Sequence, residues 1–150
     1  MPSIDQLRRT TKGFFDKHWD RNFGIVPPKW SKAWTFFHEL PFNNHKGCYV
    51  HVRDEDVVYI GVALNSGLNG YENHSLGTRI SKYCLVVETK QKVDGKTYYK
   101  PSPILAERGI DTISTLGFPL GEQKYLAIAL EYYPIQQLKP TDNVIYNKQR

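Results

Sequence analysis

Apolar and polar residues alternate along residues 47–61, GCYVHVRDEDVVYIG, with the two-residue period of a β-strand. In the first arm the apolar residues are Cys48, Val50 and Val52, and the residues between them are Tyr49, His51 and Arg53. Tyr49 and His51 should therefore point to the same side of the strand. After a polar tip, the returning arm alternates Val57, Tyr59 and Gly61 with Val58, Ile60 and Val62. The pattern predicts a β-hairpin that places Tyr49 and Tyr59 on neighbouring strands.

The N-terminal segment has the spacing of an amphipathic helix that runs from Ser3 to about residue 19. Ser3 followed by Gln6 is a capping-box signature. The inward side would carry Ile4, Leu7, Thr11, Phe14, Phe15 and His18, and the opposite side Arg8, Arg9, Lys12 and Lys17. These cations fit either a solvated helix face or, less commonly, a surface that contacts phosphate.

Pro27 and Pro28 end this pattern, and a second short helix is predicted from Ser31 to Leu40. Its aromatic stripe consists of Trp30, Trp34, Phe36 and Phe37. Such a stripe is typical of a packed core, and a base-stacking platform is the alternative.

The middle of the chain combines a loop, a helix and a basic hairpin. Residues 62–75 are rich in Gly and Asn, which is typical of a loop, and a helix is predicted from Ser75 to Cys84. One side of that helix would carry Arg79, Lys82 and Tyr83. Asp94-Gly95 predicts the turn of a lysine-rich hairpin over residues 85–100, which fits either a flank for nucleic acid or an edge kept soluble by its lysines.

The C-terminal third is predicted to contain a helical turn at 104–108, a strand at 110–116 and a helix from about Gly121. Pro134 lies inside this helix and should kink it just after Glu131, because proline lacks a backbone donor and clashes with the preceding turn.

The composition limits the class of protein. A chain of 150 residues with 40% hydrophobic and 23% charged residues is expected to form one domain, and no apolar run is long enough for a membrane helix. The N-terminus lacks a secretory signal pattern, and Cys48 and Cys84 belong to no CxxC pair, which indicates reduced thiols in a cytoplasmic protein. Spacing alone leaves a disulfide between them open. The formal net charge of +5 favours a polyanionic partner.

A series of polar residues in fixed order gives the most specific signal. The series consists of Tyr49 in GCY, Tyr59 and Gly61 in YIG, Arg79 in GTRISKY, Glu131 in the last helix, and Asn143 after Lys139-Pro140. It resembles the GIY-YIG nuclease family, whose members share two such tyrosines, a helix arginine, a later glutamate and a terminal asparagine. The spacing E-x8-P-x2-N of Glu131, Pro140 and Asn143 is also similar to that of the family's repair and restriction members.

The chain departs from the family pattern at several places. GCY replaces GIY, the loop before Arg79 is longer than usual, and the basic hairpin is an insertion. Tyr83 stands where many members carry histidine, although other members have tyrosine there. The resemblance covers residues 46–145 and leaves residues 1–45 as an N-terminal helical extension.

The resemblance implies an α+β fold with a small, mainly antiparallel three-stranded sheet, flanked by the helices of Arg79 and Glu131. It also implies a metal-dependent DNA endonuclease, with Tyr49 as general base and Tyr59 as an orienting hydroxyl. Tyr83 would lie near the leaving group, and Asn143 would tie the C-terminal segment to the site. A base role for Tyr49 requires neighbouring cations to lower its pKa, because a free phenol titrates near pH 10.

Phosphodiester hydrolysis is compatible with these side chains on chemical grounds. Arg79 suits bidentate pairing with the scissile phosphate, and Glu131 suits a Mg²⁺ or Mn²⁺ ion that keeps most of its waters. Weaker candidates for contact with nucleic acid are His51, Lys82, Lys90, Lys92 and Lys96.

The absence of a separate DNA-binding region favours a restriction-type or phage-type enzyme, and cutting both strands would need a homodimer or successive nicks. Two alternatives remain open: a structure-selective repair or recombination nuclease, and a catalytically silent nucleic-acid-binding protein on the same scaffold.

Overall fold

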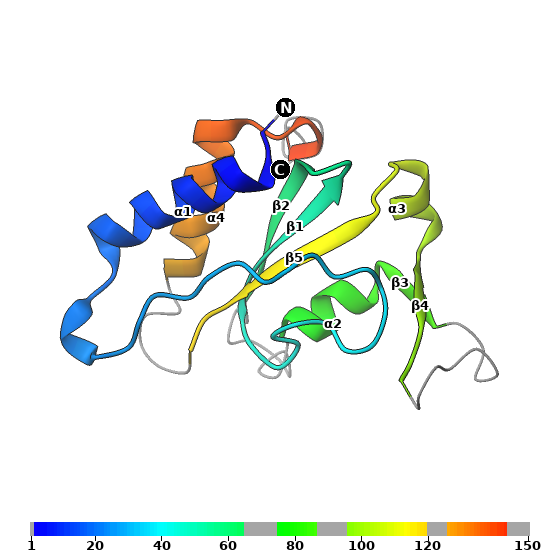
Figure 1. Cartoon of the computed structure of the whole chain (residues 1–150), viewed down its shortest axis with the longest axis horizontal. Coiled ribbons are helices and arrows are strands. Elements are labelled where there is room, and N and C mark those ends of the chain that lie inside the picture. The colour runs from blue at the N-terminus through cyan, green and yellow to red at the C-terminus, as the bar shows by residue number, and fades with distance from the viewer. Residues whose placement is uncertain (1, 65–74, 87–95, 120–125, 144–150) are drawn as a thin grey trace.

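A three-stranded antiparallel sheet with strand order β2-β1-β5 forms the centre of the molecule (Figure 1). The strands are β1 (Gly47–Arg53), β2 (Asp56–Ala63) and β5 (Thr112–Gly117). The structure, a computed structural model, describes residues 2–64, 75–86, 96–119 and 126–143. The predicted α+β class and the predicted antiparallel sheet are confirmed.

Helices and a two-stranded ribbon surround this sheet. The helices are α1 (Ile4–His18), the 3-10 helix η1 (Arg21–Phe23), α2 (Leu76–Ser81), α3 (Pro103–Glu107) and α4 (Leu126–Leu138). The ribbon pairs β3 (Cys84–Val86) antiparallel with β4 (Tyr99–Pro101). These short strands are the arms of the predicted basic hairpin, whose turn at Asp94-Gly95 lies outside the described residues. None of the described helices is long and apolar enough to cross a membrane.

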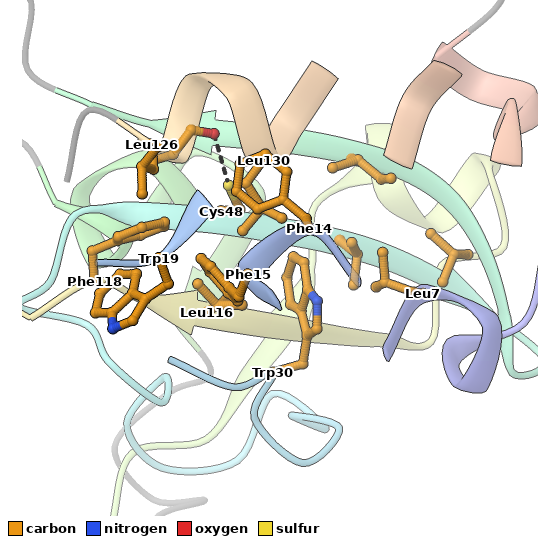
Figure 2. Packing of buried hydrophobic residues seen from close by; sticks show 14 of the residues in the cluster. Leu7, Phe14, Phe15, Trp19, Trp30, Cys48, Leu116, Phe118, Leu126 and Leu130 are labelled. Carbon is orange, nitrogen blue, oxygen red and sulfur yellow. Dashed lines mark hydrogen bonds between the residues drawn. The ribbon is translucent and has the colours of Figure 1, made fainter. Parts of the chain in front are cut away.

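Helices α1 and α4 cover the face of the sheet that carries Cys48, Val50 and Val52 (Figure 2). Helix α1 begins with the predicted capping box, in which the side chains of Ser3 and Gln6 each accept a hydrogen bond from the other's backbone amide. The buried members of this core include Leu7, Phe14, Phe15, Trp19, Leu116, Phe118, Leu126 and Leu130. The N-terminal helix is therefore packed into the main core.

A β-bulge changes the predicted alternation of the returning arm. The register pairs His51 with Tyr59 but Val52 with Val57, so Val58 is the extra residue. Val57 consequently packs with the α1/α4 core, and Val58 joins the opposite face. The expectation that Val57 shares a face with Tyr59 was wrong, because an extra residue shifts the two-residue period by one.

The predicted helix from Ser31 to Leu40 is not formed. This segment runs in extended form along β5, where the Trp34 amide donates to the Ile113 carbonyl (2.8 Å) and the Ile113 amide donates to the Trp34 carbonyl (3.1 Å). Phe36 and His38 have positive φ angles of 66° and 65°, which interrupt regular structure. Pairing with the open edge of β5 outweighs the local helical pattern. Trp30, Trp34 and Phe36 are buried in the core, as predicted, whereas Phe37 is only half-buried.

The C-terminal end of the described chain closes the other edge of the sheet. Helix α4 continues through Pro134 to Leu138, and Asn143 follows as a fully buried residue. The Asn143 side-chain amide donates to the Ile60 carbonyl (2.8 Å), and its oxygen accepts from the Ile60 amide (2.7 Å). Asn143 thus satisfies two backbone groups of the edge strand β2, as its predicted tying role requires.

Replacing Asn143 by alanine is expected to lower the free energy of unfolding by about 2–4 kcal/mol, because two buried backbone groups lose their partners. Urea denaturation measures this change. Asn44→Ala, at an exposed position, is the matched control and should change stability by less than about 0.5 kcal/mol. Equal stability of the two variants would contradict the proposed tie.

Candidate active site

Four aromatic rings gather on the face of the sheet opposite α1 and α4. Tyr49 and His51 project from β1, Tyr59 from β2, and Tyr83 from the turn after α2. The Tyr49 ring centroid lies 6.2 Å from those of Tyr59 and Tyr83, and 5.5 Å from that of His51. The prediction that Tyr49 and His51 share a face is confirmed. These four residues and Arg79 of α2 are called the tyrosine site.

Gly61 is part of this arrangement because the Tyr49 ring lies directly over it. Gly61 pairs with Tyr49 across the hairpin, and a Cβ atom added to Gly61 would lie 2.7 Å from Tyr49 Cε1 and 2.5 Å from its hydroxyl oxygen. Side-chain carbon atoms do not approach this closely. The glycine of the YIG motif therefore lets the tyrosine of the GCY motif cross the second strand.

The Tyr49 hydroxyl is buried in a setting that favours its protonated form. Burial raises the pKa of Tyr49 well above its ordinary value, and the phenols of Tyr83 and Tyr59 raise it further, whereas Arg79 acts in the opposite direction. The hydroxyl makes no well-formed hydrogen bond to any residue that the structure describes, although Tyr83 and Arg79 lie near enough to act on it. The lowered pKa that a general base needs is not present in this form of the protein.

Arg79 supplies a positive charge beside these phenols. Its partial burial alone would lower its pKa, but Tyr49, together with Tyr83 and Tyr59, outweighs this effect and raises the pKa, so the guanidinium stays charged. Its Nε is buried without a hydrogen-bond partner among the described residues. Burial at this level is favourable only when the charge meets polar groups, such as the phenols or an incoming anion.

His51 lies at the centre of a column of rings with a cation at each end. Its ring stacks on Tyr59 (5.0 Å, 25°) and meets Tyr83 edge to face (4.7 Å, 83°). The Arg108 guanidinium lies 5.6 Å from the Tyr59 ring, and the Lys82 ammonium lies 5.1 Å from the Tyr83 ring. Burial, followed by the charges of Arg108 and Lys82, lowers the pKa of His51 to about 3, so the ring is neutral at pH 7.

Arg108 and Asp142 form a buried ion pair next to the tyrosine site that the sequence pattern did not reveal. Arg108 Nε donates to one Asp142 oxygen (2.7 Å), and Arg108 Nη2 lies 2.6 Å from the same oxygen as an ion pair. The pair joins the end of α3 to the segment that carries Asn143. No spacing rule connects positions 34 residues apart, and the position of Asp142 one residue before Asn143 was the only available signal.

Glu131 comes from the opposite side of the sheet. It lies half-buried on α4, and its carboxylate adds to the effect of burial in raising the pKa of the Cys48 thiol. The structure thus gathers Tyr49, Tyr59, Tyr83 and Arg79, whereas Glu131 lies on the helix that covers the opposite face, close enough to Cys48 to act on its thiol.

The remaining candidate residues are four lysines and the two cysteines. Lys82 and Lys96 are exposed, and Lys96 lies 6.0 Å from the Phe37 ring, whereas Lys90 and Lys92 lie outside the described residues. Cys48 and Cys84 are free thiols, which decides against the disulfide.

Within the described ranges, three or more His, Cys, Asp or Glu side chains do not gather into a metal-binding group. A Mg²⁺ ion that keeps most of its waters needs only one or two protein carboxylates, and the half-buried Glu131 retains contact with solvent. The carboxylate of Glu131 is therefore a suitable ligand for such an ion.

Comparisons with protein-family models, with curated proteins and with solved structures found no match to this chain. The function of the tyrosine site is therefore inferred from the motif and from the geometry of these residues.

Replacing Gly61 by alanine is expected to lower the free energy of unfolding by about 1–3 kcal/mol, because the new methyl group overlaps the fully buried Tyr49 ring. Thermal or urea denaturation measures the loss. Gly13→Ala is the control: nothing lies within 4 Å of the added Cβ, and the helical position should gain up to about 1 kcal/mol. An unchanged Gly61→Ala protein would show that the ring does not lie over Gly61.

The neutral state of His51 should appear as a pH dependence of stability. Its pKa is lower in the folded protein, about 3, than in the unfolded chain, about 6.5, so its contribution is complete above pH 6.5 and is lost as the pH falls toward 3. Between pH 7 and pH 5 the wild type should lose about 2 kcal/mol more than His51→Phe. Urea titrations at both pH values test this, and parallel losses would contradict the neutral, buried imidazole.

Proposed function

We propose that this protein is a metal-dependent nuclease with a GIY-YIG-like site that hydrolyses phosphodiester bonds in DNA. The observation that supports the proposal most strongly is the gathering of Arg79 and three tyrosines on one face of the sheet, with the first tyrosine lying over the glycine of the second motif.

A phosphodiester anion suits the charges of this face. Arg79 remains charged, and its buried Nε, which has no hydrogen-bond partner among the described residues, can pair with phosphate oxygens. Lys82 is exposed beside Tyr83 and adds a second cation, and the chain carries a formal net charge of +5. These cations would attract the backbone of a nucleic acid independently of its sequence.

In the proposed site, Tyr49 holds its proton until the substrate is bound. The protonated hydroxyl can donate to a phosphate oxygen or orient the attacking water, and a base role requires more positive charge than Arg79 alone provides. Glu131 would hold the Mg²⁺ ion, which when bound would neutralise phosphate charge and lower the pKa of coordinated water. Tyr59 and Tyr83 would orient the Tyr49 hydroxyl and the water, and Asn143 would fix the β2 edge.

A catalytically silent nucleic-acid-binding protein is the second candidate. The raised pKa of Tyr49, and the origin of Glu131 on the helix behind the sheet, favour this alternative. Binding without cleavage would use Arg79 and Lys82 in the same way. The finer assignment to restriction-type, phage-type or structure-selective enzymes would be decided by offering linear and branched duplexes together.

A plasmid-nicking assay tests the proposal. The wild type should nick supercoiled DNA with Mg²⁺ or Mn²⁺ and not with EDTA. Glu131→Ala should reduce the rate at least 100-fold while DNA binding is kept, because the metal ligand is lost. Arg79→Lys should reduce the rate by about 10²-fold, because an ammonium keeps the charge but loses bidentate pairing.

Glu107→Ala is the matched control for Glu131→Ala, since Glu107 is an exposed glutamate at the end of α3. It should nick at the wild-type rate. Binding by the wild type without nicking in either metal would favour the silent binding protein, and full activity of Glu131→Ala would refute the assigned role of Glu131.

A further inference from the structure

His51 carries a chemical group that its packing does not explain. Its side chain is completely buried, and neither ring nitrogen has a hydrogen-bond partner among the residues that the structure describes. A buried polar atom without a partner destabilises the folded protein. The contacts that His51 does make, with Tyr59 and Tyr83, are ring contacts. A phenylalanine would make those contacts without this cost.

A second polar group in the same condition lies two residues away. The Tyr49 hydroxyl is also buried without a well-formed hydrogen bond, and the Tyr49 and His51 ring centroids are 5.5 Å apart. The Tyr49 oxygen lies on the axis about which its own ring turns, so a hydrogen bond between the two groups requires the His51 imidazole to turn toward it. In the free protein Arg79 acts on the same hydroxyl. Arg79 can only donate to this hydroxyl oxygen, and a phosphate that draws Arg79 away would leave the hydroxyl free to turn its O–H toward the imidazole.

We propose that His51 is a positioning residue of the tyrosine site, whose neutral ring accepts a hydrogen bond from the Tyr49 hydroxyl when a nucleic-acid phosphate is bound. This inference rests on the proposed function for its cleavage readout. His51 does not touch the substrate, because it is completely covered. It acts by fixing the direction in which the Tyr49 oxygen presents its lone pairs.

The surroundings of His51 keep the ring in its accepting form. Lys82 lies against Tyr83, Arg108 lies against Tyr59, and Arg79 lies beside Tyr49. The carboxylate next to this group of rings is that of Asp142, and it forms an ion pair with Arg108. An imidazolium between these cations would be repelled, so one ring nitrogen keeps its lone pair at neutral pH.

Two substitutions separate this role from simple packing. His51→Phe keeps the ring contacts and removes both nitrogens, so at pH 7 it should melt no lower than the wild type yet nick DNA at least 10-fold more slowly, with DNA binding unchanged. His51→Gln places an amide acceptor in the same space and should recover part of the rate. A wild-type nicking rate in His51→Phe overturns the proposal, and so does a loss of rate that only follows a loss of melting temperature in both variants.

A measurement without cleavage keeps the two proposals separable. Imidazole ¹⁵N spectra are recorded with duplex DNA in EDTA, and the His51 acceptor nitrogen should move in the direction expected for a new hydrogen bond. The movement should be absent in Tyr49→Phe. If DNA changes the His51 ¹⁵N chemical shift but the wild type does not nick DNA, the proposed nuclease function is refuted and the role of His51 is kept. If the wild type nicks DNA but the His51 chemical shift does not change, only the role of His51 is refuted. If neither nicking nor a change in chemical shift is seen, both proposals are refuted.

Discussion

The contact between the Tyr49 ring and Gly61 is the constraint on which the candidate site depends. Because Gly61 has no side chain, the ring of Tyr49 crosses from β1 onto β2, and its hydroxyl reaches the region where α2 presents Arg79. Tyr59 and Tyr83 then pack around this ring at similar distances. A larger residue at position 61 would turn Tyr49 away from both strands, and the phenols would no longer share one environment with the guanidinium.

The side chains of the central strand β1 alternate between two faces with different surroundings. One face, with Cys48 and Val50, packs against α1 and α4 in a core of ordinary apolar contacts. The other face holds Tyr49 and His51, whose buried polar atoms lack good partners among the described residues. Groups of that kind cost stability, and the apolar core on the first face offsets the cost. Polar burial that is costly and clustered is typical of functional sites rather than of cores.

Features set by neighbouring residues could be predicted from the sequence, and features set by distant residues could not. The capping box of Ser3 and Gln6, the hairpin and the shared face of Tyr49 and His51 all follow from local periodicity. The extended path of residues 31–40 does not, because it depends on the open edge of β5. Nor does the pair between Arg108 and Asp142, which joins segments 34 residues apart. The bulge at Val58 is local to the hairpin, but the alternation of apolar and polar residues carries no sign of an extra residue. Sequence order alone named Glu131, without showing that it comes from the helix behind the sheet.

The charges of the tyrosine site limit the chemistry that can take place there. With Tyr49 protonated and His51 neutral, the free site presents the cations Arg79, Lys82 and Arg108, of which Arg108 is paired with Asp142. The charges of such a site favour an anion, but the phenol is poorly suited to remove a proton from water, because burial raises its pKa. An additional positive charge near Tyr49 would have to arrive with or after the substrate. In the proposed enzyme a metal ion would bring this charge, so its catalytic form is expected to assemble only with substrate bound.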